Sequence, residues 1–288
     1  MPRARSRRSG VAPARTIRRG ASPRTTRAGV IGAIVRVAAP VILCALLACV
    51  PIARAEPADS LWRRAVDLAD THRGWVPGYA ETVVEELAGD GSVKHRRTSG
   101  LRLFLNDVGE LDQELVTVTE DGADITADER KALREERRRR EARDGEAAPA
   151  ALMQPFTGPL PFLPEAQSNV MIQRVEAAGA PEGGPHVAFE FRHDFGAAHQ
   201  IRGLAWLDAP TGTPVQVRFT PEPLPSGVKE LKVTMRFSDP ADSAWTMRTI
   251  EIEGTSRFLF FFTRRYRTQT TFRDYWWNEA AARAEDSR

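Results

Sequence analysis

The sequence predicts a mainly β (α+β) protein: one strongly curved antiparallel sheet, an N-terminal helix packed on its concave face, and a charged helical insertion. Three observations predict this fold class. Apolar and polar residues alternate with a period of two over most of the chain after residue 79, which is typical of antiparallel strands with one wet face. One early segment has a helical apolar stripe, and one later segment is a helix that is polar all round. The apolar face of such a sheet needs a cover, and the early helix can supply it.

The first 55 residues differ in charge from the rest of the chain. They hold eleven arginines and no acidic residue, and removing those eleven from the 41 basic residues leaves 30 against 38 acidic residues in 56–288, a net charge of −8. An Arg-rich arm, the apolar run Val37–Ile52 and the small-x-small site Ala53-Arg54-Ala55 are typical of a cleaved export signal. We therefore expect residues 1–55 to be a signal peptide, with an h-region at about 37–52 and processing at Ala53 and Ala55, and the rest of the chain to be periplasmic.

Three alternatives to a cleaved signal stay open. Leu46-Leu47-Ala48-Cys49 resembles a lipobox, which would leave Cys49 lipidated, while Arg7-Arg8 and Arg18-Arg19 are twin-arginine pairs of the kind used in Tat export. An uncleaved anchor would keep its arginines on the cytoplasmic side. All three still place the body of the protein beyond the inner membrane.

The composition also excludes some classes of protein. Both cysteines lie in the first 55 residues, so we expect no disulfide and no thiol nucleophile in the exported part. The acidic body gives no support to nucleic-acid binding.

The exported part begins with the predicted helix and a meander. A cap at Asp59 or Ser60 and a helical stripe of apolar residues predict a helix over Ser60–Thr71. The turn Gly89-Asp90-Gly91 joins the predicted strands Ala80–Leu87 and Val93–Leu105 into a hairpin, and a third strand is predicted over Leu111–Thr119.

Residues 122–165 form the predicted insertion. Thr126–Asp144 has eight basic and six acidic residues, so its helix cannot bury a face and is expected to project into water or to sit in a flexible insertion. Thr126 and Glu129 have the spacing of a capping box. An interpretation of Arg137–Arg140 as a basic patch for nucleic acid or lipid is weaker than that of a solvated helix with interleaved glutamates. Gly145–Pro164 is rich in proline and predicts an extended connector that lies partly on apolar surface.

The second half of the chain is predicted to continue the meander up to residue 277, followed by a tail over 278–288. The predicted domain thus covers 56–277. A change of phase in Trp245–Glu253 predicts a β-bulge near Arg248-Thr249. The predicted strands are Val170–Ala177, Val187–His193, Ile201–Asp208, Val215–Phe219, Leu231–Phe237, Trp245–Glu253 and a last strand that ends at Tyr275-Trp276-Trp277.

Two short motifs resemble a known family. Gly203–Asp208 (GLAWLD), followed by Thr211-Gly212 and Pro214-Val215, is similar to the "G-x-x-W-[IL]-D…T-G-x-P" strand-turn-strand of the periplasmic lipoprotein-sorting carriers (LolA-like), and Thr270–Tyr275 (TTFRDY) resembles their closing motif. The insertion at 122–165 departs from these compact carriers. The resemblance implies a half-barrel whose concave apolar face is covered by helices and holds a lipid or lipoprotein acyl chain.

The sequence identifies which residues would line such a face. Candidate lining residues are the apolar residues of the alternating strands and the motif tryptophan, namely Phe189, Phe191, Trp206, Val217, Phe219, Val233, Met235 and Phe237. A filled core with the same residues is the competing interpretation, because apolar lining alone does not separate a cavity from a core.

No pattern in the sequence carries catalytic chemistry. His186, His193 and His199 lack the spacing of metal ligands, and no nucleophile elbow, phosphate loop or dinucleotide fingerprint is present. We therefore expect no enzyme, no cofactor and no metal. The first hypothesis is an envelope protein that carries an acyl chain. The alternative is a non-catalytic sensor or interaction module with a filled core, which contacts an envelope protein through 122–165.

Overall fold

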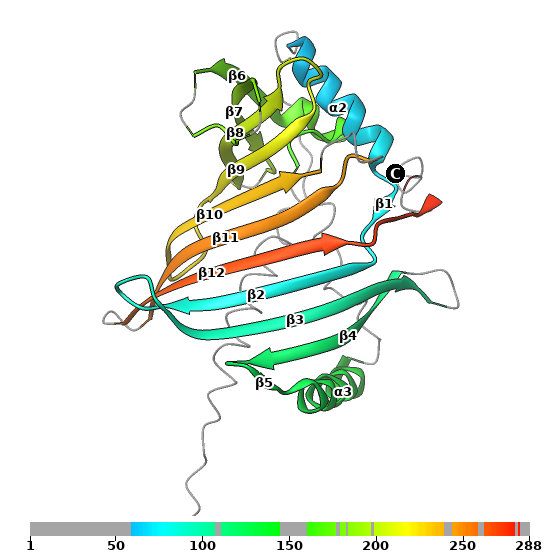
Figure 1. The fold of residues 1–288 in the computed structure, drawn as a ribbon, viewed down its shortest axis with the longest axis vertical. Helices are drawn as coiled ribbons and strands as arrows, with labels where there is room; N and C mark the ends of the chain where they lie inside the picture. Colours follow the sequence, from blue (N-terminus) through cyan, green and yellow to red (C-terminus); the bar gives the residue numbers. More distant parts are fainter. Residues whose placement is uncertain are drawn as a thin grey trace, which may run out of the picture. The chain divides into compact units, whose positions relative to one another are not determined.

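The computed structural model describes residues 59–106, 111–144, 160–176, 179–182, 184–196, 199–238, 244–258, 262–279 and 282 (Figure 1). The predicted leader, with its processing residues Ala53 and Ala55 and the alternative Cys49, lies outside the described residues, as does the part of the connector over 145–159. Among the described residues, no helix is both long enough and apolar enough to cross a membrane.

One large antiparallel sheet dominates the described structure. It has 11 strands in the order β5-β4-β3-β2-β12-β11-β10-β9-β8-β7-β6, and every neighbouring pair is antiparallel. The strands are β2 (Tyr79–Leu87), β3 (Val93–Leu105), β4 (Leu111–Glu120), β5 (Ala123–Asp124), β6 (Val170–Val175), β7 (His186–Asp194), β8 (Gln200–Asp208), β9 (Pro214–Glu222), β10 (Val228–Phe237), β11 (Met247–Phe258) and β12 (Phe262–Arg273).

The sheet is curved and open, as the sequence predicted. The strand direction turns steadily from β4 to β7 (Figure 1), and in the described structure β5 and β6 are the two edges and do not pair with each other. This arrangement confirms the predicted fold class, a strongly curved antiparallel sheet that does not close into a barrel.

Helix α2 (Ser60–His72) covers one face of this sheet. Its N-cap is Asp59, whose carboxylate accepts a hydrogen bond from the Leu61 N–H at 2.9 Å. The side chains of Trp62, Ala65 and Ala69 are buried. They belong to the same hydrophobic cluster as β7–β10, so α2 covers this end of the sheet. We call the face that α2 covers the core face and the opposite face the outer face.

The connector also contributes to the cover. Its described part, from Leu160, leads into a 3-10 helix, η2 (Pro164–Asn169), that the sequence did not predict. Leu160 and Phe162 are buried in the same cluster as α2, which confirms that part of the connector lies on apolar surface. The Trp62 indole N–H donates to the side-chain oxygen of Gln167 at 2.9 Å, so this hydrogen bond ties the two covering segments together.

The other end of the sheet is bordered by the charged helix, α3 (Thr126–Asp144). The expected capping box does not form. The Thr126 hydroxyl oxygen instead accepts a hydrogen bond from the Val118 N–H on β4 at 2.8 Å, and the Glu129 carboxylate lies 3.0 Å from the Arg97 guanidinium on β3. The beginning of α3 is therefore fixed to the sheet, and the cap residues serve that attachment.

Two irregularities of the strands have local causes. Arg236 pairs with Thr249 and Phe237 with Met247, which leaves Arg248 as an extra residue and confirms the predicted bulge. The predicted last strand breaks at Asp274, which has a φ of 58°, a left-handed conformation that ends pairing. The residues after it form a separate two-stranded sheet, in which β13 (Trp276–Trp277) pairs with β1 (Trp75–Val76).

The residues that resemble the carrier family build the β8–β9 turn. The Asp208 carboxylate accepts hydrogen bonds from the Thr211 N–H at 2.9 Å and from the Thr211 hydroxyl at 2.6 Å, and Gly212 has a φ of 80°. At Gly203 the backbones approach so closely that an added Cβ would lie 2.1 Å from the Arg218 carbonyl oxygen. The motif thus specifies a tight strand-turn-strand unit.

Arg130 on α3 compensates for a bulge in β4. Gly100 pairs with Thr117 and Leu101 with Leu115, so Val116 has no partner residue on β3. The Arg130 guanidinium donates to the carbonyl oxygen of Leu115 at 2.9 Å and to that of Val116 at 3.2 Å. Arg130 thus supplies hydrogen-bond donors to backbone acceptors at the point where the bulge interrupts the regular pairing of β4 with β3.

We expect Arg130→Ala to lower the free energy of unfolding by about 1–3 kcal/mol, since it removes two charge-assisted hydrogen bonds. Chemical denaturation measures the change. Arg138→Ala on the same helix is the matched control, because Arg138 is exposed and its replacement should change stability by less than about 0.5 kcal/mol. Equal effects of the two variants would contradict this role of Arg130.

Candidate functional site

Seven of the eight predicted lining residues lie together on the core face. Cross-strand pairing places Phe189 beside Ala205, and Val217 beside Met235. The seven are Phe189, Phe191, Val217, Phe219, Val233, Met235 and Phe237, and their exposed fractions range from 0% to 8%.

These seven side chains are in contact with protein side chains that cover them. The Trp62 ring on α2 lies 5.5 Å from the Phe189 ring and 4.8 Å from the Phe162 ring, measured between centroids. Phe237 stacks on Trp245 at 4.6 Å, and the Trp245 indole N–H donates to the Pro214 carbonyl oxygen at 2.9 Å. In the described structure this part of the core face is therefore a packed core.

Trp206, the eighth predicted residue, lies on the outer face. It pairs with Ala188 on β7 and with Gln216 on β9, one position out of phase with the core-face residues Ala205 and Val217. A one-residue step along a strand reverses the direction of the side chain, so Trp206 and the other seven candidates cannot line one cavity. Trp206 is nevertheless fully buried.

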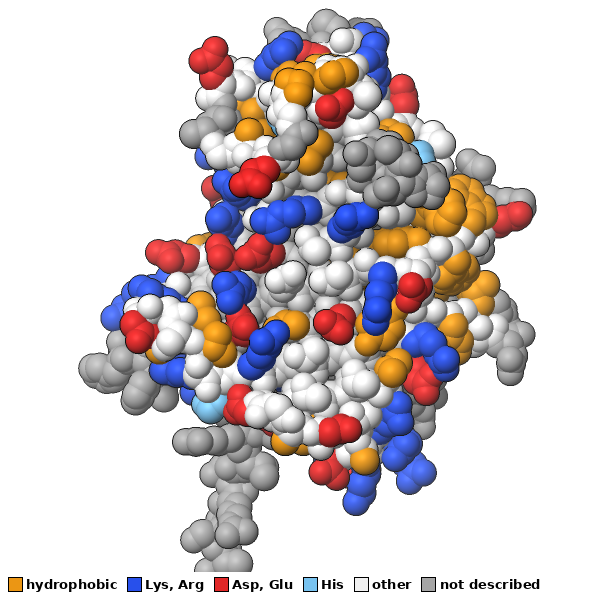
Figure 2. Space-filling model, in the orientation of Figure 1, with side chains coloured by type: hydrophobic (Ala, Val, Ile, Leu, Met, Phe, Trp, Pro, Cys, Tyr) orange, Lys and Arg blue, Asp and Glu red, His pale blue; other side chains and the backbone are white. Residues whose placement is uncertain are grey.

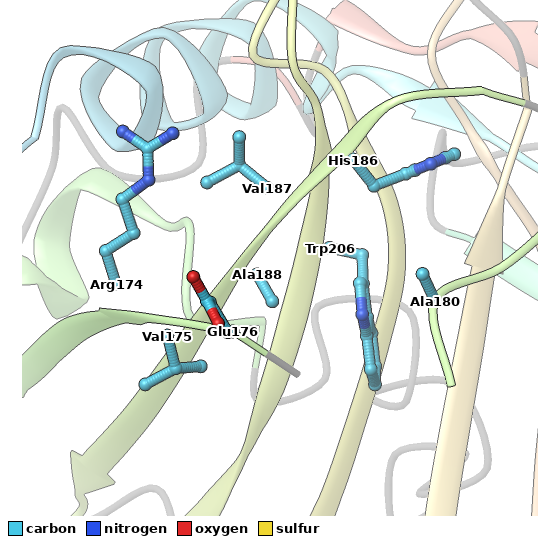
Figure 3. Close-up of a pocket in the computed structure, with 8 residues that line it drawn as sticks. All are labelled: Arg174, Val175, Glu176, Ala180, His186, Val187, Ala188 and Trp206. Carbon is cyan, nitrogen blue, oxygen red and sulfur yellow. The ribbon is translucent and has the colours of Figure 1, made fainter. Parts of the chain in front are cut away.

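A pocket of about 490 Å³ lies beside Trp206 at the β6–β7 edge of the sheet. In Figure 3 the indole is seen edge-on, with Ala188 on one side of it and Ala180 on the other. The Trp206 indole N–H has no hydrogen-bond partner among the described residues, which is unusual for a buried tryptophan. The lining residues are Arg174, Val175, Glu176, Ala180, His186, Val187, Ala188 and Trp206.

Three arginines gather on the outer face of β7, β8 and β9. Arg192 and Arg202 are directly opposite each other in the β7–β8 register, and Arg218 lies opposite Leu204, two residues further along β8. The Arg218 guanidinium lies 5.0 Å from the centre of the Trp206 ring, a cation–π contact. We call Arg192, Arg202 and Arg218 the arginine patch.

The rest of the outer face has paired charges. Figure 2 shows acidic and basic side chains interspersed over the middle of the sheet. Arg236 lies 3.1 Å from Glu251 across β10 and β11. Arg267 on β12 donates its Nε–H to the Glu85 carboxylate on β2 at 2.9 Å, and Glu85 is only 8% exposed. Cross-strand pairs of this kind stabilise a sheet.

The arginines after the Phe258–Phe262 run are part of this pairing. Arg267 is bonded to Glu85, and Arg264 lies 3.8 Å from Glu86 on β2. Residues 259–261 lie outside the described residues. The charges of Arg264 and Arg267 are therefore balanced within the sheet by glutamates of β2.

The histidines do not form a common site. His193 is buried on the core face between Val170 and Ile201, and burial lowers its pKa to about 4. His186 lies at the other end of β7, where its Nδ1 is 2.6 Å from the Gly184 carbonyl oxygen. Within the described ranges no three His, Cys, Asp or Glu side chains group in a way that could hold a metal ion.

Comparison with known proteins gives matches among solved structures alone. No family model matches the sequence, and the search of curated proteins finds no match. Among solved structures, the complex of MucB with MucA(peri) is similar with a TM-score of 0.20 and 10% identity, covering 75% of this chain and 94% of that chain. The MucA/MucB complex of Pseudomonas aeruginosa has a TM-score of 0.22 and 12% identity, with coverages of 74% and 94%. With TM-scores this low, we assign neither a family nor a function from these matches.

Sequence reasoning found the core face but missed the arginine patch. Arg192 and Arg218 alternate with the apolar residues of β7 and β9, so the sequence pattern alone places them on the wet side of their strands. The register that brings Arg202 opposite Arg192 was not readable from one strand at a time. The usable signal was the recurrence of arginine at outward positions of three consecutive predicted strands.

Proposed function

We propose that this protein is a non-catalytic interaction module of the cell envelope, with a filled core under α2. The observation that carries the proposal is that Phe189 and its six neighbours are buried in one hydrophobic cluster with Trp62 and Phe162, in which the Trp62 ring lies against both Phe189 and Phe162. An acyl chain that entered this region would have to displace well-packed aromatic side chains, which contribute several kcal/mol each when buried. The Arg-rich leader supports the envelope location.

The competing function is a carrier of a lipid or lipoprotein acyl chain. The carrier-like motif supports it, but in this structure Gly203, Asp208 and Gly212 have evident structural tasks in the β8–β9 turn. The two functions make opposite statements about the core face. A carrier needs space beside Phe189, whereas an interaction module uses the core only as a scaffold for its surfaces.

Lipid analysis of the purified chain separates the two functions. We expect native mass spectrometry and solvent extraction to find no acyl lipid in a stoichiometric amount. Added fatty acid should leave the indole and Phe189 ring signals in NMR spectra unchanged. A stoichiometric lipid whose binding shifts the signals of Trp62 and Phe189 would contradict the proposal and establish a carrier.

A further inference from the structure

The core face continues beyond the part of the sheet that α2 covers. Val233 on β10 lies directly opposite Ile252 on β11, and the register carries this row on across β12 and β2 to β3. Directly opposite residues lie on the same face of a sheet. We call the core face of β12, β2 and β3 the central band. The row crosses it at Thr268, Val84 and Arg97.

The two described α-helices lie on either side of the central band. In the sheet, α2 contacts β8, while α3 contacts β4. The strands β12, β2 and β3 lie between these contacts in the strand order (Figure 1). The central band therefore needs a different cover if it is to be kept from water.

Side chains of the central band are nevertheless buried. Val84 is only 8% exposed, whereas Val83, its neighbour on the outer face of the same strand, is half-buried. Tyr266 on β12 is 9% exposed, and burial raises the pKa of its phenol. One side of the Tyr266 ring rests on Gly254, where an added Cβ would lie 2.4 Å from the ring. The other side of the ring, like Val84, needs a cover from outside the described residues.

The connector begins and ends on this same face. At its start, the Glu129 carboxylate on α3 lies 3.0 Å from the guanidinium of Arg97, a residue of the central band. At its end, Leu160 and Phe162 are buried in the core-face cluster with Trp62. Residues 145–159 link these two places, and the central band lies between them.

The length and composition of residues 145–159 suit a position over the central band. Fifteen extended residues reach about 50 Å, and the seven strand spacings from β4 to β8 add up to about 34 Å. The run 147–164 has no charged residue in a chain that is 27% charged, and it carries Leu152, Met153 and Phe156. Apolar side chains of this size gain free energy when they cover an apolar face.

We propose that residues 145–159 lie across the central band, with Leu152, Met153 and Phe156 against the face that holds Val84 and Tyr266. The connector is then an internal occupant of the core face. A ligand or a partner protein can reach the central band only by displacing it. This inference goes beyond the proposed function, because it concerns β12, β2 and β3 and not the core under α2.

Photo-crosslinking of the full chain tests which segment is the cover. With p-benzoylphenylalanine in place of Phe156, we expect mass spectrometry to find cross-links to β12 and β2. The same reagent in place of Leu133, which is 44% exposed on α3, is the control and should not reach these strands. Cross-links to β12 and β2 from Leu46 in the leader, in place of those from Phe156, would overturn the assignment to the connector.

Variants of the connector test the cover by the exposure of Val84. A soluble gadolinium chelate enhances the NMR relaxation of methyl groups that water can reach. We expect Phe156→Asp to raise the enhancement at the Val84 methyls to that at the Val83 methyls, because a carboxylate is costly to bury on an apolar face. Gln154→Asp adds the same charge at a polar position and should leave Val84 protected. An unchanged enhancement at Val84 in Phe156→Asp would refute the proposal.

A failure of this proposal is distinguishable from a failure of the proposed function. A stoichiometric acyl lipid at Trp62 and Phe189 would contradict the interaction module and would leave the Phe156 cross-links as they are. Absence of lipid together with absence of those cross-links would leave the module but remove the connector from the central band.

Discussion

Replacing Phe189 by alanine should lower the free energy of unfolding by about 3–5 kcal/mol. Phe189 is fully buried, and its ring contacts the ring of Trp62 on α2. Truncation removes the transfer free energy of the ring and leaves a cavity that a packed core only partly closes. Denaturant unfolding followed by circular dichroism measures the loss.

The control for this prediction is Leu133→Ala. Leu133 is a large apolar residue that is 44% exposed on α3, and its truncation should change stability by less than about 1 kcal/mol. A Phe189→Ala variant that stays as stable as Leu133→Ala would show that the site tolerates empty space. That result would indicate a cavity beside Phe189 in place of a packed core, and it would support the carrier function.

Loss of stability between pH 6.5 and pH 4 is the second large expected effect, and His193 is its source. Burial lowers the pKa of His193 to about 4, and the nearby Asp194 carboxylate opposes this only in part. The His193 ring lies tilted against the Phe195 ring, with 4.1 Å between the ring centroids, and its Nδ1 has no hydrogen-bond partner in the described structure. The folded protein therefore holds the neutral form.

The sign follows from the two pKa values. In the unfolded chain the histidine protonates near pH 6.5, whereas in the folded protein it protonates only near pH 4. As the pH falls, the unfolded state binds a proton before the folded state does. The contribution of His193 to the free energy of unfolding is therefore complete above about pH 6.5 and is lost as the pH falls below that value. The loss is about 2 kcal/mol at pH 5 and approaches about 3 kcal/mol below pH 4.

We expect His193→Phe to remove most of this pH dependence, because Val170, Ile201 and Phe195 already surround the site with apolar surface. Unfolding free energies measured from pH 7 to pH 4.5 provide the comparison. The pKa values of the Asp90, Asp121 and Asp124 carboxyls are lowered by their hydrogen bonds. These groups change the free energy of unfolding only below about pH 4, where they become protonated. Identical slopes for His193→Phe and the native chain above pH 4.5 would refute the assignment.

Strand pattern was sufficient to predict most of the architecture. The period-two alternation in β7, β9 and β10 required one apolar and one polar face for each strand, and the phase change after Trp245 located the bulge at Arg248. The predicted helices also occur at the expected places, because an apolar stripe and a run of charges are local properties of the chain.

Elements that depend on distant contacts were not predictable. Thr126 and Glu129 have the spacing of a capping box. In the structure, however, the Thr126 hydroxyl accepts a hydrogen bond from Val118 on β4, and Glu129 forms an ion pair with Arg97 on β3. The last strand has no sequence signal for its break at Asp274, where β13 turns to pair with β1. In both cases a tertiary partner decides between two locally acceptable conformations.

The candidate site shows the same division. Composition and alternation determined that Phe189, Val217 and Met235 share an apolar face, since side-chain direction in a strand is fixed by position. Only the tertiary structure decided that Trp62 fills the space beside that face, because α2 and the sheet meet across long stretches of chain. The strand register likewise placed Arg202 opposite Arg192. Pairing energy depends on which strands become neighbours, and no single strand encodes that.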